Sequence, residues 1–250
     1  FHEAIGDTIS LSVSTPKYLK SIGLMNDDEN SKEALINYQL SMALQKIAFL
    51  PFAYIVDLWR WDVFAGKITV DNYNKKWWEY RIKYQGVSPP IKRSEHDFDP
   101  GAKYHVPADV PYVSYFVATF LQFQFHEALC KVAKEAVLYE CSIAGNKEAG
   151  AKLRNMLSYG SSIPWTRQLK QFTGAEKLSA KPILKYFEPL RIFLKKELKN
   201  EKIGWNVNVD DETETEQDET EQNKEAISKQ RIASDVHGRS SDHYYIMPEI

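Results

Sequence analysis

The sequence predicts an all-α protein, and three observations support that class. Apolar residues recur at steps of three and four in several long segments, as they do on one face of a helix. Few runs alternate strictly between apolar and polar residues, as a strand would. The chain has 250 residues, of which 43% are hydrophobic and 13% aromatic, so it can bury a sizeable core. The helical pattern covers residues 34–47, 116–133, 149–157 and 183–198.

Several helix starts are marked by a small polar residue that can cap the first amides. The capping sequences are Asn30-Ser31-Lys32-Glu33, Thr69-Val70-Asp71 and Ser179-Ala180-Lys181-Pro182. Residues 84–110 differ, because they hold four prolines and two glycines. We predict a long ordered loop there, and loops of that length in a compact domain are usually functional.

Charge divides the chain into two parts. Residues 1–209 carry 28 Lys and Arg against 22 Asp and Glu, whereas residues 210–250 carry 4 against 12. We predict one domain over residues 1–205 and an acidic, disordered tail over residues 206–250, because so charged a segment cannot bury enough apolar surface to order itself. Binding of a basic partner is the alternative for the tail. The basic residues of the body are spread along the chain, which argues against a nucleic-acid partner.

The apolar runs and the first residues bear on location. The longest apolar region, residues 48–56, is short of the roughly 20 apolar residues that a membrane helix needs, so no transmembrane segment is predicted. The chain opens with neither a methionine nor a secretory signal. We therefore expect a fragment or a processed product.

The first segment that could carry chemistry is His2-Glu3-Ala4-Ile5-Gly6-Asp7. It fails as a His-Glu-x-x-His zinc helix, because Gly6 stands where the second histidine would be. Glu3 and Asp7 lie one helical turn apart, so both carboxylates would project from one face. A solvated helix face and a metal site are both compatible with that pair.

The second segment runs from Lys103 to Phe116. Lys103 and His105 share a face if this segment is extended. Pro111 suits the first turn of a following helix, on which Tyr112 and Tyr115 would lie on the same side. A cation, an imidazole and two phenols suit an anionic, peptide-like ligand. Tyrosines packed against a core beside an exposed lysine are the alternative.

Two further pairs have both a functional and a structural interpretation. Trp77 and Arg81 share a helix face and could stack or hold an anion, or could be aromatic packing with an arginine whose stem lies along it. Cys130 and Cys141 lie eleven apart. They could form a local disulfide, which would suit an oxidising compartment, or remain two buried thiols.

Taken together, these segments resemble the angiotensin-converting-enzyme family of zinc dipeptidases. The resemblance covers about residues 1–205, and its strings are long and specific. They are Phe1-His2-Glu3-Ala4-Ile5-Gly6-Asp7, Leu11-Ser12-Val13-Ser14-Thr15-Pro16, Trp59-Arg60-Trp61, Lys83-Tyr84-Gln85-Gly86, Asp97-Phe98-Asp99-Pro100-Gly101-Ala102-Lys103, Gln122-Phe123-Gln124-Phe125-His126-Glu127-Ala128-Leu129-Cys130 and Gly204-Trp205.

The resemblance implies a metal site. Glu3 matches the third zinc ligand of a two-histidine, one-carboxylate set that leaves a fourth position for water. Asp7 matches the carboxylate that orients a ligating histidine. The family's His-Glu-x-x-His helix, which supplies the two histidines and the general-base glutamate, is absent from this sequence. The chain alone is therefore expected to be inactive and to lack tight zinc binding.

The resemblance also implies a substrate site. His105 and Tyr115 match the groups that hold the substrate backbone and donate to the oxyanion as water attacks the scissile carbonyl. Lys103 and Tyr112 match the anchors for the terminal carboxylate of the substrate. Phe49 and Phe52 match side chains that line the pocket for the last residue of the substrate.

Trp77 and Arg81 match part of a chloride site in the same family, and Cys130 and Cys141 match a family disulfide. Three positions depart from the family pattern. Ser114 stands where an arginine of a second chloride site is usual. Gln45 and Thr119 stand where a vertebrate member has an acidic and an aromatic pocket residue.

The resemblance thus implies the C-terminal portion of a two-lobed helical fold with a deep central cleft that holds zinc. The implied function is release of C-terminal dipeptides from oligopeptides with a free C-terminus, by a secreted, extracellular enzyme. Zinc is the implied cofactor, with chloride as a further ion. The alternative is a non-catalytic family member that binds peptides or a protein partner through the same cleft.

Overall fold

The structure is a computed structural model that describes residues 1–26 and 31–207. It separates into two units, Phe1–Trp205 and Asn206–Ile250, and almost all of the second unit lies outside the described residues, as does the acidic tail predicted there. The described residues contain helices and no strand, so the all-α prediction is confirmed. The α-helices are α1 (His2–Val13), α2 (Pro16–Ser21), α3 (Lys32–Lys46), α4 (Phe49–Phe64), α5 (Tyr73–Gln85), α6 (Val113–Val132), α7 (Lys147–Ser158), α8 (Trp165–Thr173), α9 (Lys181–Tyr186) and α10 (Glu188–Glu197). Two 3₁₀ turns, η2 (Val70–Asn72) and η3 (Asp99–Ala102), flank α5.

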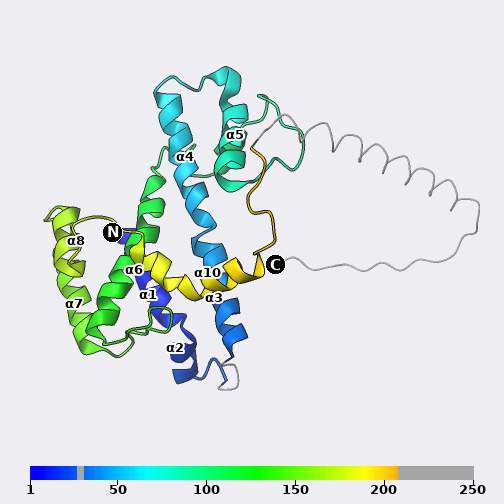
Figure 1. The fold of residues 1–250 in the computed structure, drawn as a ribbon. Helices are drawn as coiled ribbons and strands as arrows, with labels where there is room; N and C mark the ends of the chain where they lie inside the picture. Colours follow the sequence, from blue (N-terminus) through cyan, green and yellow to red (C-terminus); the bar gives the residue numbers. More distant parts are fainter. Residues whose placement is uncertain (27–30, 208–250) are drawn as a thin grey trace, which may run out of the picture. The chain divides into compact units, whose positions relative to one another are not determined.

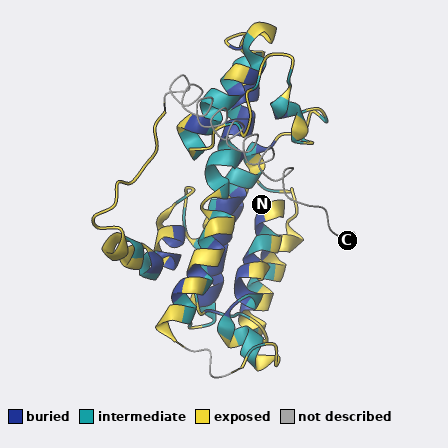
Figure 2. Cartoon of the chain, turned by 90° about the vertical axis from the view of Figure 1, so that its right-hand side faces the viewer, coloured by how far each residue is buried: buried dark blue, intermediate teal, exposed yellow. Residues whose placement is uncertain are grey.

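Helix α6 is the centre of the Phe1–Trp205 unit, and helices from both ends of the sequence pack on it (Figure 1). It contacts α1, α4, α7, α8 and α9, and eleven of its residues are buried. Figure 2 shows the buried residues along the inner sides of the helices and the exposed residues on their outer sides. Burial of apolar area on this scale is the main force that holds such an assembly together.

The periodic segments mostly became single helices. Ser31 caps α3, as predicted, by accepting a hydrogen bond from the amide of Ala34 at 3.0 Å. The run over residues 183–198 is instead broken between α9 and α10 at Phe187. Pro189 sits in the first turn of α10 and has no amide hydrogen to donate, which explains why the helix restarts there.

The predicted long loop follows α5 and is fastened to that helix. Glu95 accepts hydrogen bonds from the amides of Asn74 and Lys75 in the first turn of α5, at 2.9 and 2.8 Å. Asp99 accepts from the side chain of Asn74 at 2.9 Å and pairs with Arg93. The loop is therefore ordered by polar contacts rather than by a core of its own.

The other end of α5 is closed by the last residues of the unit. Gly86 ends the helix with φ +66°, and a Cβ there would lie 2.5 Å from the Trp205 ring. The indole nitrogen of Trp205 donates to the carbonyl of Ile82 at 2.6 Å. Only glycine meets both requirements, since it tolerates a left-handed backbone and leaves room for the ring.

By length and apolar composition alone, the helical stretch Lys32–Phe64 could cross a membrane, which the sequence prediction had excluded. This stretch contains charged residues, whereas the prediction required an uninterrupted apolar run. The core helix of an ordinary globular domain can have the same length and apolar composition. Here α4 carries the buried ion pair Asp57–Arg60 and packs on α5 and α6.

Candidate active site

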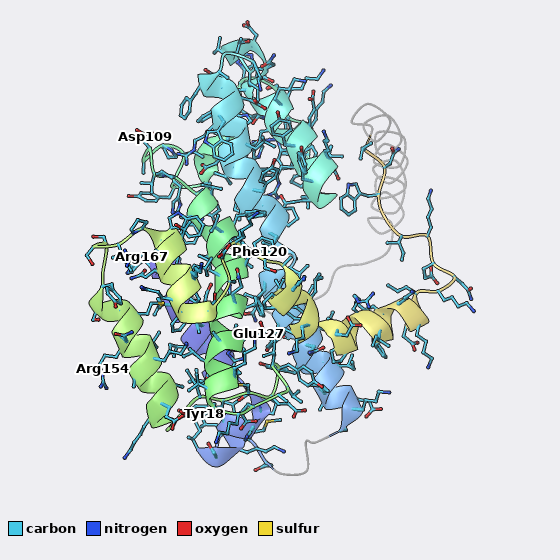
Figure 3. All side chains as sticks on the ribbon, turned by 60° about the vertical axis from the view of Figure 1, so that its left-hand side comes forward. Tyr18, Asp109, Phe120, Glu127, Arg154 and Arg167 are labelled. Atoms are coloured by element: carbon cyan, nitrogen blue, oxygen red, sulfur yellow. A yellow bond between two sulfur atoms is a disulfide. The ribbon has the colours of Figure 1, made fainter. Side chains whose placement is uncertain are left out.

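The site is built on the loop that leads from η3 into α6. The loop is not extended, as the sequence analysis had assumed, but folds through consecutive turns. The amide of Val106 donates to the carbonyl of Lys103 at 2.8 Å, and that of Val110 to His105 at 2.9 Å. Pro111 lies before the N-cap Tyr112 instead of inside the helix. Figure 3 shows this loop, marked by Asp109, beside α4 and α6.

Three aromatic rings meet where the loop enters α6. The ring centroids of His105 and Tyr112 lie 4.7 Å apart, those of His105 and Tyr115 5.6 Å, and those of Tyr112 and Tyr115 4.9 Å. The sequence prediction that the two tyrosines share a side of the helix is confirmed. Tyr112 is buried at 5% exposure, and His105 and Tyr115 are partly exposed.

Lys103 extends the cluster with a cation. Its ammonium nitrogen lies 4.8 Å from the centroid of the Tyr112 ring. It forms no ion pair with any carboxylate of the described residues. A cation held by an aromatic face and left without a protein anion is well suited to a carboxylate ligand.

The surroundings of His105 favour its neutral form, because they lower its pKa. Burial lowers its pKa, and the positive charges of Lys103 and Arg60 lower it further, while the carboxylates of Asp57 and Glu3 oppose them. Its Nδ1 atom is buried and has no hydrogen-bond partner among the described residues. A neutral imidazole with an unpaired ring nitrogen can still make a hydrogen bond to a ligand.

Phe49 and Phe52 lie on α4 beside this cluster. Their ring centroids are 6.2 and 5.8 Å from that of Tyr112, and both side chains are partly buried. Arg81 lies next to them, with its guanidinium carbon 5.3 Å from the Phe52 ring and 6.0 Å from the Trp77 ring. The predicted shared face of Trp77 and Arg81 is confirmed.

Arg81 has a hydrogen-bond donor that no described residue uses. Its Nε atom is buried without a hydrogen-bond partner in the described part of the chain, and burial lowers the pKa of its guanidinium. The aromatic rings around it contribute attraction to a cation but no counter-charge. A partly buried guanidinium in this state favours an added anion.

Glu3 and Asp7 both project from α1, but their surroundings differ. Glu3 is exposed and forms no ion pair within the described residues, although its charge raises the pKa of His105 and of the N-terminal amine. Asp7 is partly buried and accepts from the Lys46 ammonium at 3.0 Å and from Gln122 Nε2 at 3.1 Å. Asp7 is therefore held in place, whereas Glu3 is free to act as a ligand.

Cys130 and Cys141 form a disulfide, which settles the two alternatives that the sequence left open. Both are fully buried, and His126 Nε2 lies 3.4 Å from the sulfur of Cys130 while bonding the carbonyl of Leu138 at 2.8 Å. The disulfide joins the end of α6 to the segment that follows it.

Sequence reasoning missed two residues of the site, Asp57 and Arg60. They lie three apart on α4, and both are buried. Arg60 donates to the carbonyls of His105 and Val110, and Asp57 accepts from the amide of Tyr112 at 2.8 Å. The available signal was a pair of opposite charges three apart within a mainly apolar helix.

Comparison with known proteins connects this arrangement to a family. The family model described as angiotensin-converting enzyme matches residues 1–205. The chain belongs to the angiotensin-converting enzyme family. The predicted resemblance is confirmed.

Individual relatives of the angiotensin-converting enzyme family match the same part of the chain. The angiotensin-converting enzyme of Oryctolagus cuniculus is 52% identical over 208 residues, which cover 82% of this chain and 16% of that protein. The angiotensin-converting enzyme of Theromyzon tessulatum is 53% identical over 191 residues, or 76% of this chain and 31% of that protein. The angiotensin-converting enzyme-like protein Ace3 of Mus musculus is 46% identical over 208 residues, or 28% of its length. The chain thus spans less than a third of each of these relatives.

The three departures from the angiotensin-converting enzyme pattern have different surroundings. Ser114 and Gln45 are exposed. Thr119 is buried at 3% exposure, and its hydroxyl donates to the carbonyl of Tyr115 at 2.9 Å. Thr119 therefore bonds the backbone one turn before it on α6.

Proposed function

We propose that the full-length protein is a zinc-dependent peptidyl-dipeptidase that acts outside the cell and releases C-terminal dipeptides from oligopeptides. The observation that carries the proposal is the cluster of Lys103, His105, Tyr112 and Tyr115, whose rings lie 4.7 to 5.6 Å apart. Residues 1–205 would form the C-terminal part of a two-lobed catalytic domain with a central cleft. Residues 206–250 would form an acidic tail.

In this proposal the cluster has two tasks. Lys103 and Tyr112 bind the terminal carboxylate of the peptide, because an unpaired ammonium and a phenol can both donate to it. His105 and Tyr115 donate to the carbonyl oxygen of the scissile bond, on which negative charge develops. The separation of the two pairs sets how many residues lie between the free C-terminus and the bond that breaks.

Glu3 would be one ligand of the zinc ion, and its exposed carboxylate without an ion pair fits that role. Among residues 1–26 and 31–207, the group of three or more His, Cys, Asp or Glu side chains close enough to share an ion is His126, Cys130 and Cys141, and it does not include Glu3. In this proposal the other two ligands are the histidines of the family's His-Glu-x-x-His helix in the full-length protein. When bound, zinc polarises the scissile carbonyl and activates water. Asp7, fixed by Lys46 and Gln122, would orient one of the ligating histidines.

Two further roles follow from the same surroundings. The unpaired guanidinium of Arg81 beside Trp77 fits a chloride ion. Ser114 carries no charge, so it cannot supply the positive charge of a second anion-binding site. Phe49 and Phe52 would line the pocket for the last residue of the peptide, because their rings lie next to Tyr112.

The experiment compares the full-length protein with the 250-residue chain, both incubated with zinc and with a peptide that has a free C-terminus. Mass spectrometry should detect a released dipeptide with the full-length protein, and a chelator should abolish it. The 250-residue chain should show neither turnover nor stoichiometric zinc. Peptide binding without turnover by the full-length protein would instead make it a non-catalytic binder, and turnover by the short chain would refute the assignment of ligands.

A further inference from the structure

The ion pair between Asp57 and Arg60 is the most deeply buried one in the described part of the chain. Its side chains are 3% and 8% exposed, whereas every other ion pair there has at least one side chain more than 20% exposed. Burying two charges costs several kcal/mol per ion, and their mutual attraction often does no more than offset that cost. A need for stability alone therefore does not account for the pair.

Apart from the bonds between Asp57 and Arg60 themselves, the hydrogen bonds of the pair's side chains go to the loop that carries the cluster. One oxygen of Asp57 accepts from the amides of Tyr112 and Val113 at 2.8 and 2.7 Å, and the other accepts from Arg60. Arg60 Nη1 donates to the carbonyl of His105 at 3.0 Å, and Nη2 donates to that of Val110. The planar guanidinium can reach both carbonyls while it pairs with Asp57, because its donors are set in a fixed fork.

These bonds fasten the loop at both of its ends. At one end, the bonded carbonyl belongs to His105, whose ring faces Tyr112 and Tyr115. At the other end, the bonded amides are those of Tyr112 and Val113, where α6 begins. Tyr112, the N-cap residue, makes no side-chain cap of its own, so Asp57 supplies the cap from α4. Between the two ends the backbone of Asp109 has φ +54°, which a non-glycine residue rarely adopts unless its surroundings enforce it.

We propose that Asp57 and Arg60 are positioning residues, which hold the loop so that His105 and Tyr115 face the substrate in one fixed geometry. This inference rests on the function proposed above, because it takes the cluster as the substrate site. Neither residue touches the substrate. They act through the backbone of the residues that do.

The test compares two double variants of the full-length protein that are matched in chemistry. The first, Asp57→Leu with Arg60→Met, removes both charges and leaves no lone buried ion. The control, Asp62→Leu with Lys67→Met, removes an ion pair with a nitrogen–oxygen distance of 2.8 Å at the C-terminal end of the same helix, together with the hydrogen bond that Tyr80 donates to Asp62, and neither residue bonds the loop. A single variant, Arg60→Lys, keeps the charge but loses the fork.

Three quantities are measured for each variant: kcat, the midpoint of thermal unfolding, and deuterium uptake by peptides that cover residues 103–115. The first double variant should lose on the order of 10²-fold in kcat, the loss expected from displacing catalytic groups by about 1 Å. Its deuterium uptake should rise in residues 103–115 only, and its midpoint should stay near that of the wild type. The kcat and the deuterium uptake of Arg60→Lys should lie between those of the first double variant and those of the wild type. The control should match the wild type.

Unchanged kcat and unchanged deuterium uptake in the first double variant would overturn the proposal. A rise in uptake across the whole unit with a lower midpoint would also overturn it, because the pair would then be a general element of stability. If the wild type itself shows no turnover, the proposed function fails. The uptake of residues 103–115 still decides whether the pair positions the loop.

Discussion

Removal of the Lys103 ammonium is expected to weaken binding of peptides that end in a free carboxylate. The ammonium lies 4.8 Å from the Tyr112 ring and forms no ion pair with the described carboxylates, so nothing in this part of the chain competes for it. A hydrogen bond to a charged group contributes about 1.5–3 kcal/mol. Because 1.4 kcal/mol corresponds to a factor of ten, Lys103→Ala should raise KM by about 10- to 150-fold.

The assay uses two peptides of the same sequence, one with a free C-terminus and one amidated, and compares their KM values in the full-length protein. Lys103→Ala should affect the free acid strongly and the amide little, since only the acid carries the charge. Lys83→Ala is the matched control, because Lys83 lies 5.2 Å over the Tyr84 ring in a similar arrangement outside the cluster. Equal losses on both peptides, or an equal effect of Lys83→Ala, would refute the carboxylate anchor.

Three other predictions concern catalysis, the disulfide and pH. Tyr115→Phe in the full-length protein should lower kcat by on the order of 10²–10³ if the phenol donates to the oxyanion, and unchanged turnover would exclude that role. Replacing Cys130 and Cys141 together by serine should cost about 3 kcal/mol in urea unfolding of the 250-residue chain, the loop-closure value for a separation of 11 residues; reduction of the wild-type chain should cost the same, and a reduced chain of unchanged stability would contradict this. The hydrogen bond from Arg93 lowers the pKa of Asp99 to about 2, from an ordinary value of 3.8. Its stabilisation, about 2 kcal/mol, is therefore present above about pH 4 and lost as the pH falls towards 2; Asp99→Asn should flatten that part of the stability–pH curve, and an unaltered curve would count against it.

The helices could be predicted from the sequence because the signal for them is local. A helical face repeats every three or four residues, and a cap lies next to the helix that it caps, as Ser31 does for α3. The break before α10 was missed because apolar residues continue through it. Its cause, Pro189, is visible in the sequence, but a proline in the first turn of a helix is compatible with either one helix or two.

The sequence predicted that the residues of the cluster lie together, but the reason was correct for only one of its two pairs. Tyr112 and Tyr115 come together because they lie three apart on a helix, which is a local rule. Lys103 and His105 were grouped on the assumption of an extended segment, whereas the loop folds back through turns. Lys103 contacts the Tyr112 ring across the eight loop residues between them, and no periodic pattern describes such a path.

The position of the loop depends on contacts that are distant in the sequence, since Arg60 lies 45 residues before His105 and 50 before Val110. The sequence nevertheless indicates the helix side of these contacts, though not their partners in the loop. Opposite charges three apart in the most apolar helix must either face water or be buried as a pair, and Trp59 between them is buried at 3% exposure. A buried pair needs further polar partners, because two charges alone leave hydrogen-bonding groups unsatisfied. The carbonyls of His105 and Val110 and the amides of Tyr112 and Val113 meet that need, so the loop is held by the helix beneath it as well as by its own turns.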